Sequence, residues 1–204
     1  MKEIKTIEEV LKAMKWNGQA LSFMPMKQRT AELCLEAVKY YGWAIKYVPK
    51  ELCTVELCLA AVKRHSGALQ FVPDELRTAE VCLEAVKGDG DALKYVPTEQ
   101  RTPELCLEAV KQNSWAIKYV PAELRTLELC HKAVKQNGLT LQFVPAELLR
   151  TPDVCVEAVK QDSGALQFMP DKLRTPEVCL EAMKQNGWAL QFVPTELRTL
   201  ELMP

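Results

Sequence analysis

The chain has 204 residues, of which 48% are hydrophobic and 26% are charged, a composition typical of globular proteins that excludes a disordered chain. Its 26 Lys and Arg residues against 27 Asp and Glu residues give a net charge of -1, so no global field attracts nucleic acid or an anionic membrane. No apolar run is long enough to cross a membrane, and the first residues, MKEIKTIEEV, are acidic where a signal peptide is apolar, which predicts a cytoplasmic protein.

The chain is built from imperfect copies of one segment, seen clearly in TPEVCLEAMKQNGWALQFVPTELR at residues 175–198. The copies start at Thr6, Thr30, Thr54, Thr78, Thr102, Thr126, Thr151 and Thr175, and a partial ninth copy starts at Thr199. Their period is 24 residues, except where Leu148-Leu149 adds a residue, and we number the positions of each copy from its threonine. Self-similarity at this period predicts an all-α fold: an alpha-solenoid of eight helix-turn-helix repeats plus a partial ninth, in a single domain over residues 1–204.

Each copy predicts two helices and a turn. Thr175 is a good N-cap, and Pro176 suits the first helical position, so a helix of about eleven residues starts at each threonine. Asn186-Gly187 ends that helix, with the glycine expected in the left-handed conformation. A second helix of about seven residues runs to the residue before Pro194, and at most one further turn precedes the next threonine.

Cysteines form one column. Seven of the eight lie at the fifth position, which predicts reduced, buried thiols because stacked helices are too far apart for disulfides. Val10 fills that column in the first copy, and Cys53 replaces the arginine that ends most copies. Without a CxxC or paired Cys/His spacing, we expect no metal and no cofactor.

Two basic columns and one aromatic column recur. In five copies the lysine at position 10 follows a glutamate by three residues, as Lys111 follows Glu108, so an ion pair is favoured over a ladder that tracks phosphates. The arginine at position 24 is expected to pair with a glutamate of the next helix, as Arg101 with Glu104. The aromatic residue at position 18 lies beside Leu and Val and is expected in the core. A nucleic-acid-binding array that uses the Lys and Arg ladders is therefore the alternative function.

The segments TPELCLEAVKQNSWAIKYVPAEL at 102–124 and TPEVCLEAMKQNGWALQFVPTEL at 175–197 resemble a family of bacterial repeats of unknown function, the DUF4116-like repeats. The resemblance covers residues 6–198, with a layout similar to leucine-rich repeat variant solenoids. This chain departs from the pattern in carrying Val-Pro or Met-Pro after the aromatic residue of every copy. The resemblance implies a helical repeat and no known chemistry.

No catalytic constellation is present, because His65 and His131 lack a fixed nucleophile or carboxylate partner, and we expect no enzyme. We expect a scaffold that binds an unknown protein partner, and no membrane. Positions 11, 12 and 14 are close to uniform in the later copies, with Gln at position 11 followed by Asn or Asp, but carry Trp, Tyr and Arg in the earlier ones, residue types that dominate interface hot spots. The partner-binding residues predicted on this basis are Trp16, Tyr40, Tyr41, Trp43, Arg64 and His65.

An open alternative is that end copies drift because they cap the array, and that Trp43, like Trp115 and Trp188, packs on its neighbour. The segment Thr199 to Pro204 is too short to cover the last complete copy. We therefore also expect end-to-end self-association or a longer natural chain.

Overall fold

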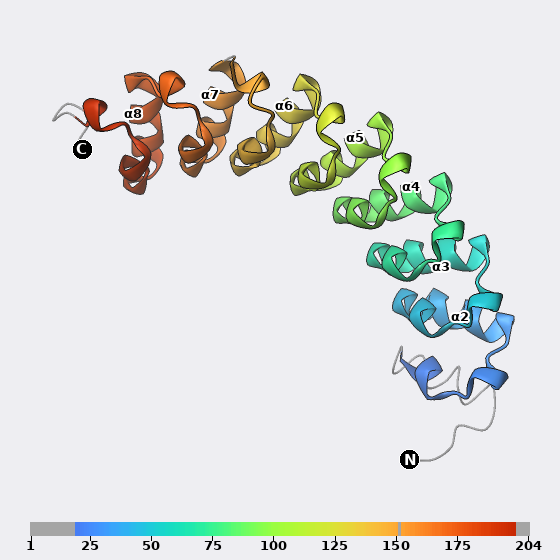
Figure 1. Ribbon diagram of the computed structural model, residues 1–204. Coiled ribbons are helices and arrows are strands. Elements are labelled where there is room, and N and C mark those ends of the chain that lie inside the picture. The colour runs from blue at the N-terminus through green and yellow to red at the C-terminus, as the bar shows by residue number, and fades with distance from the viewer. Residues whose placement is uncertain (1–18, 151, 199–204) are drawn as a thin grey trace. The chain divides into compact units, whose positions relative to one another are not determined.

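The computed structural model describes residues 19–150 and 152–198, without the side chain of Arg150, and shows an all-α repeat solenoid (Figure 1). Each described repeat from Thr30 onward has an α-helix, a six-residue 3₁₀-helix and a three-residue 3₁₀-helix. The α-helices are α2 (Ala31–Tyr40), α3 (Val55–Arg64), α4 (Ala79–Gly88), α5 (Pro103–Gln112), α6 (Leu127–Gln136), α7 (Pro152–Gln161) and α8 (Pro176–Gln185). The longer 3₁₀-helices are η3 (Gly42–Tyr47), η5 (Ser66–Phe71), η7 (Gly90–Tyr95), η9 (Ser114–Tyr119), η11 (Gly138–Phe143), η13 (Ser163–Phe168) and η15 (Gly187–Phe192), and the first repeat retains η1 (Ala20–Phe23). The short ones are η2 (Met26–Gln28), η4 (Lys50–Leu52), η6 (Asp74–Leu76), η8 (Thr98–Gln100), η10 (Ala122–Leu124), η12 (Leu148–Arg150), η14 (Asp171–Leu173) and η16 (Thr195–Leu197).

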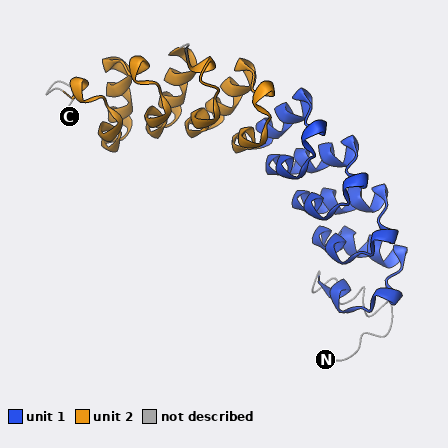
Figure 2. Cartoon of the chain, viewed as in Figure 1, with its two compact units in different colours: residues 1–112 blue, residues 113–204 orange. Residues whose placement is uncertain are grey.

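The chain divides into two compact units, residues 1–112 and residues 113–204 (Figure 2). In unit 1, α2, α3, α4 and α5 pack in sequence order, and each six-residue 3₁₀-helix contacts the α-helix of its own repeat and that of the next. In unit 2, α6, α7 and α8 follow the same scheme. Stacking of successive repeats, as predicted, is how short helices bury their apolar faces.

The α-helices begin as the sequence predicts. The hydroxyl of Thr30 accepts a hydrogen bond from the backbone N–H of Leu33 at 3.3 Å, and Thr54 caps α3 in the same way at 3.2 Å. Pro176 occupies the first turn of α8, where its missing N–H leaves no hydrogen bond unmade.

The α-helices end differently from the prediction. Across the described residues no glycine has a positive φ, so the expected left-handed glycine is wrong. The helix stops because the residue at position 12 is extended, as at Asn186 with φ -155° and ψ 114°. The glycine that follows serves close packing instead: a Cβ on Gly42 would lie 2.4 Å from the carbonyl oxygen of Ala61, and one on Gly138 would lie 2.2 Å from that of Ala158. The residues at position 13 of one repeat and at position 8 of the next are small because the two backbones lie close together there.

The second helix is confirmed and is a 3₁₀-helix of six residues, one shorter than predicted. In η3, the residue after the helix, Val48, is extended with ψ 130°, as expected for a residue before proline. Pro49 then opens the short helix η4, which is the single further turn that the sequence predicts. With three residues per turn, the six residues of this helix make two complete turns.

The cysteine column lies in the core, as predicted. The seven column cysteines have no exposed surface, and every cysteine is free. Burial raises the pKa of Cys58 to about 12 and that of Cys106 to about 11, so both are neutral thiols at physiological pH. The thiol of Cys82 lies 3.6 Å from the carbonyl oxygen of Arg77, to which it donates. Cys53 is half-buried. No helix in the described part of the chain is long and apolar enough to cross a membrane.

Candidate interaction surface

Position 12 has a repeated structural role that the sequence did not reveal. Where it is Asn or Asp, its side-chain oxygen accepts a hydrogen bond from the backbone N–H of position 14 and caps the following 3₁₀-helix. This bond is 2.9 Å at Asp89, 3.0 Å at Asn113, Asn137 and Asn186, and 2.8 Å at Asp162. A short oxygen acceptor one residue before a helix is well suited to such a cap. This explains why the later repeats keep Asn or Asp there.

Tyr41 and His65 occupy position 12 in the second and third repeats, and neither caps its helix. Their rings meet edge to face instead, with centroids 5.6 Å apart. The His65 Nδ1 atom accepts a hydrogen bond from the backbone N–H of Gly42 at 3.2 Å. Burial and the neighbouring guanidinium of Arg64 lower the pKa of His65, which favours the neutral imidazole that this bond requires. The two repeats therefore replace a cap by a pair of rings.

Trp43 packs across the same junction, as the packing alternative predicted. Its ring lies 5.9 Å from that of Phe71 in an edge-to-face contact and 6.1 Å from that of His65. A Cβ on Gly67 would lie 2.8 Å from the indole, so Gly67 leaves space for it. In unit 2, Trp115 contacts Phe143 at 5.9 Å in the same geometry. Trp43 is half-buried and belongs in part to the stacking.

Position 11 also contacts the preceding repeat. The Arg64 Nε atom donates to the backbone carbonyl of Tyr40 at 3.1 Å, while the Tyr40 ring is 42% exposed. In unit 2, the amide of Gln185 donates in the same direction, to the carbonyls of Val159 at 3.0 Å and Lys160 at 3.1 Å. Position 11 therefore has a stacking role although its residue type varies. Arg64 binds the position-11 carbonyl of the preceding repeat, and Gln185 binds the carbonyls of positions 9 and 10.

Five of the six predicted partner-binding residues come together in unit 1. We call Tyr40, Tyr41, Trp43, Arg64 and His65 the ring cluster, which lies where α2 and α3 end and η3 and η5 begin. The sixth, Trp16, lies outside the described residues. The side chains of Tyr40 and Arg64 are exposed, and the three other rings are half-buried.

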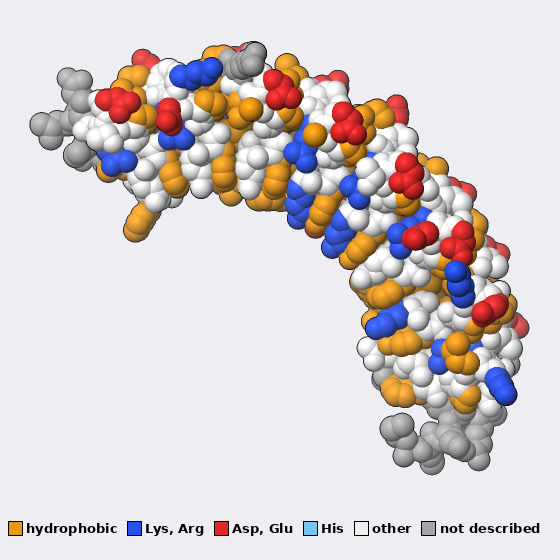
Figure 3. Space-filling view, in the orientation of Figure 1, with side chains coloured by type: hydrophobic (Ala, Val, Ile, Leu, Met, Phe, Trp, Pro, Cys, Tyr) orange, Lys and Arg blue, Asp and Glu red, His pale blue; other side chains and the backbone are white. Residues whose placement is uncertain are grey.

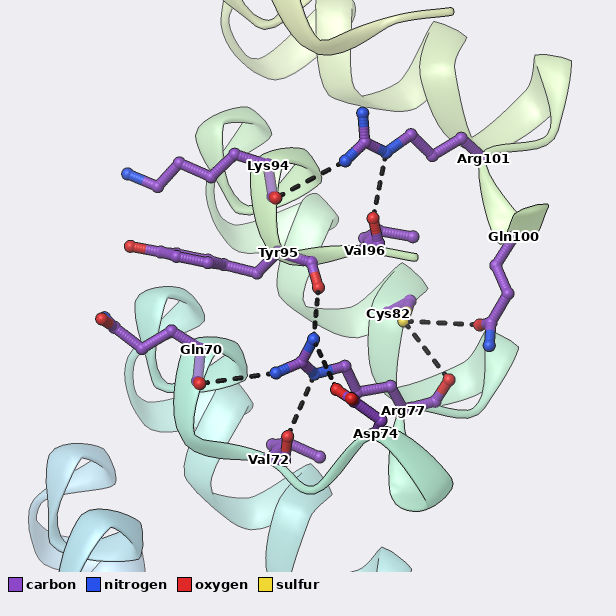
Figure 4. Close-up of polar contacts among 10 residues, drawn as sticks. All are labelled: Gln70, Val72, Asp74, Arg77, Cys82, Lys94, Tyr95, Val96, Gln100 and Arg101. Atoms are coloured by element: carbon purple, nitrogen blue, oxygen red, sulfur yellow. Dashed lines mark hydrogen bonds and ion pairs between the residues drawn. The ribbon is translucent and has the colours of Figure 1, made fainter. Parts of the chain in front are cut away.

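The sequence predicts that the arginines at position 24 pair with glutamates of the next helix, but their described contacts are mainly with backbone carbonyls. The guanidinium of Arg77 donates to the backbone carbonyls of Val72 at 3.0 Å and Gln70 at 3.4 Å within its own repeat, and to Tyr95 in the next at 3.2 Å (Figure 4). It also forms an ion pair with Asp74 at 2.9 Å. Five donors in a rigid plane let one arginine serve several orphan carbonyls, which a carboxylate contact would not satisfy.

The same pattern recurs in both units. Arg29 donates to the carbonyls of Met24 and Tyr47, and Arg174 donates to those of Met169 and Phe192. We call this arrangement the arginine clamp. Its guanidinium groups contact backbone carbonyls and are therefore largely unavailable to bind phosphate groups.

The lysine column agrees with the ion-pair prediction at two described positions. Lys39 lies 2.8 Å from Glu36, and Lys111 lies 3.6 Å from Glu108. On the face shown in Figure 3, side chains of both signs occur over each unit. At these two positions the charge of the lysine is therefore paired with a glutamate of its own helix.

The aromatic residues at position 18 are not in the core, contrary to the prediction. Those of the described repeats are half-buried, except Phe23, which is 58% exposed. Where position 17 is a lysine, its ammonium group lies over the neighbouring ring: Lys94 is 4.7 Å from the centroid of Tyr95, and Lys118 is 4.7 Å from that of Tyr119. The adjacent position 19, which is extended after the 3₁₀-helix, is buried in most described repeats, as at Val72 and Val96.

The described residues contain no group of His, Cys, Asp and Glu side chains that could hold a metal ion. No curated protein and no solved structure matches the chain. The family model for a domain of unknown function, DUF4116, matches five overlapping segments of two repeats each: residues 30–77, 54–101, 78–125, 126–174 and 151–198. These matches cover most of the chain, and they reproduce the period on which the stacking rests. The chain is therefore a member of the DUF4116 repeat family.

Proposed function

We propose that the protein is a protein-interaction scaffold that binds a protein partner through the ring cluster of unit 1. The observation that carries this proposal is the change at position 12. Tyr41 and His65 give up a cap that five other described repeats make at 2.8–3.0 Å. A side-chain cap is worth about 0.5–2 kcal/mol per helix. Sequences that depart from a local rule of their own fold often do so at functional sites.

The residue types at this edge favour a protein partner. Tyr, Trp and Arg dominate binding hot spots because they present a large rigid area with a polar group at its border. Tyr40 offers an exposed ring and Arg64 an exposed guanidinium, and the Arg64 side chain is held by its bond to the Tyr40 backbone carbonyl. Residues that are already ordered lose little side-chain entropy on binding. The corresponding edge of unit 2 has glutamine at position 11.

The experiment replaces the ring cluster with the residues that other repeats use at the same positions. The full chain carrying Tyr40→Gln, Tyr41→Asn and Arg64→Gln is compared with the parent as bait in a lysate of the source cell, and captured proteins are identified by mass spectrometry. Glutamine can keep the backward bond that Gln185 makes, and asparagine restores the cap, so Tm should not fall. We expect a partner that the parent captures to be lost by about tenfold or more, as for a hot-spot cluster.

The matched control removes two position-11 side chains from unit 2, with Gln136→Ala and Gln161→Ala. This control should capture the same partner as the parent. Equal capture by the parent and the ring-cluster variant, or a partner lost only from the control, would contradict the proposed surface.

The alternative function is binding of a single-stranded nucleic acid. The observation that favours it is the row of half-exposed aromatic rings at position 18 with lysines beside them, as at Lys94 and Tyr95. Bases stack on such rings, and lysines contact phosphates. A gel shift with single-stranded RNA or DNA at two salt concentrations separates the two functions. A shift that persists at physiological salt and weakens as salt rises would favour nucleic acid.

Two further parts belong to this proposal. We place the protein in the cytoplasm, because a column of buried free thiols suits a reducing compartment. We also assign it no catalytic role, since the imidazole of His65 already accepts a hydrogen bond from Gly42. Fractionation of the source cell tests the cytoplasmic location. Mass-spectrometric identification of a stoichiometric partner that the protein leaves chemically unchanged tests the lack of a catalytic role.

A further inference from the structure

The ring cluster offers hydrogen-bond donors to a partner and no group that can only accept. Arg64 uses its Nε atom, which donates to the Tyr40 carbonyl at 3.1 Å, and neither of its Nη atoms has an acceptor among the described residues. The Nδ1 atom of His65 accepts from the backbone N–H of Gly42, so the neutral ring carries its hydrogen on Nε2. The indole of Trp43 can only donate, and a tyrosine hydroxyl does both. A partner must therefore supply acceptors.

The end of α3 also carries positive charge that its own helix does not neutralise. In α2 and α5, Glu36 and Glu108 at position 7 pair with the lysine three residues later, at 2.8 and 3.6 Å. In α3 position 7 is Ala60, so Lys63 lacks this glutamate. Lys63 and Arg64 are both exposed, and neither forms an ion pair within the described part of the chain. The helix dipole places only about half a negative charge at this end, less than the two cations supply.

This charge is local to one repeat. In the preceding repeat Lys39 is paired with Glu36, and in the next repeat position 7 is again a glutamate while positions 11 and 12 are Gly88 and Asp89. A nucleic-acid strand that continued along this edge would bring its phosphates to the carboxylate of Asp89, whereas binding of a strand needs a continuous basic track. A single acidic side chain of a peptide fits the local charge better.

The guanidinium of Arg64 is held in a way that suits a carboxylate. Its Nε atom is bound to a backbone carbonyl, so the edge with the two Nη atoms remains for a ligand. Two parallel N–H groups on that edge match the two oxygens of a carboxylate, and a fixed guanidinium loses little freedom on binding. The Tyr40 ring, 42% exposed one repeat away, adds an apolar surface.

We propose that the ring cluster binds an acidic peptide segment of its protein partner, with a carboxylate on the Nη atoms of Arg64 and a neighbouring apolar side chain on the Tyr40 ring. This inference rests on the proposed function of the ring cluster and adds the chemistry of the segment that it binds. Lys63 strengthens the attraction without a fixed contact, because an exposed ammonium group acts as a point charge. The segment is thus recognised by one anchored charge and one apolar contact.

The test selects phage-displayed peptides of random sequence with the full chain as bait, so it needs no known partner. Peptides that bind the parent should be enriched in Asp or Glu beside an aromatic or aliphatic residue, relative to the unselected library. Arg64→Gln can keep a bond to the preceding repeat, as Gln185 does, and should remove the acidic enrichment. Arg64→Glu should shift the enrichment to Lys and Arg, because a reversed charge reverses the electrostatic complementarity. Circular dichroism checks that each variant is folded.

Affinities measured by fluorescence anisotropy with one selected peptide make the test quantitative. Replacing the acid of the peptide by its amide should weaken binding to the parent by about tenfold or more, and should leave binding to Arg64→Gln nearly unchanged. Ala60→Glu gives Lys63 the partner that other repeats have and should weaken binding severalfold. The matched control is Lys132→Gln at position 7 of α6, which changes the net charge equally in unit 2 and should bind like the parent.

Three results would overturn this inference, and they differ from failure of the proposed surface. The first is selection of peptides without acidic enrichment that the ring-cluster variant no longer binds, which would leave the surface standing. The second is an acidic enrichment that persists in Arg64→Glu, which would place the carboxylate elsewhere. The third is a parent that selects no peptide above background, in which case capture from the lysate still tests the surface by itself.

Discussion

The arginine clamp leads to a prediction in which one hydrogen bond between repeats can be isolated. Arg125 donates to two carbonyls of its own repeat, Val120 at 3.0 Å and Lys118 at 3.4 Å, and to Phe143 of the next at 3.0 Å. Arg198 makes the two intra-repeat bonds and has no described acceptor for the third. Each alanine substitution should lower the free energy of unfolding. The decrease for Arg125→Ala minus the decrease for Arg198→Ala should therefore approximate the free energy that the hydrogen bond between repeats contributes.

A hydrogen bond that involves a charged group contributes about 1.5–3 kcal/mol. We expect Arg125→Ala to lower the free energy of unfolding by that much more than Arg198→Ala, a difference of about 2–4 °C in Tm per kcal/mol for a chain of this size. The assay is urea unfolding followed by circular dichroism, at a protein concentration where the chains are monomeric. Arg125→Lys should recover little, since one ammonium cannot reach three carbonyls.

Two outcomes would refute this reasoning. If the two alanine variants lose stability equally, within about 0.5 kcal/mol, the bond to Phe143 adds nothing to the stacking. If Arg125→Lys unfolds like the parent, a positive charge at this position is sufficient and the planar clamp is not the cause. A second transition in Arg125→Ala would instead fit the reasoning, because weakened interfaces break the cooperativity of repeat arrays.

Three further predictions use the same kind of internal control. Gly138→Ala should cost about 1–3 kcal/mol in urea unfolding, because its Cβ would lie 2.2 Å from the Ala158 carbonyl, whereas Gly187→Ala, which meets nothing within 4 Å, should cost nothing. Cys53→Arg should raise the urea midpoint, because it adds the arginine clamp that this repeat lacks. The gain should be smaller than that of a native clamp, because ψ at Cys53 is 121° and must rotate toward the 58–95° of the arginine positions. Burial raises the pKa of Cys106 from the ordinary 9.0 to about 11, so its contribution to stability is intact below pH 9 and is lost between pH 9 and 11, at about 1.4 kcal/mol per pH unit. Cys106→Val should flatten the fall of stability over that range, and an unchanged slope would mean that other groups cause it.

The starts and stops of the helices could be predicted because each depends on one residue and its chemistry. Thr30 caps α2, and proline follows the end of each six-residue 3₁₀-helix, whatever the surrounding packing is. The 3₁₀ winding could not be predicted, since the choice between bonds three and four residues apart depends on how much length the neighbouring repeats leave.

The role of position 13 can be predicted from the residue types that the eight copies carry there. Glycine suits both a left-handed turn and a close approach, and one copy cannot distinguish them. The eight copies together can, because position 13 is serine at Ser66, Ser114 and Ser163, and serine gains nothing in the left-handed region. The column is therefore selected for size.

The arginine clamp and the caps at position 12 were missed because both are bonds to backbone atoms. A sequence displays charged partners such as Glu104, whereas every residue carries a carbonyl and none of them stands out. The ring cluster could be placed on one edge because its members recur at fixed positions. Its exposure could not be predicted, since Trp43 lies partly under the next repeat while Tyr40 does not.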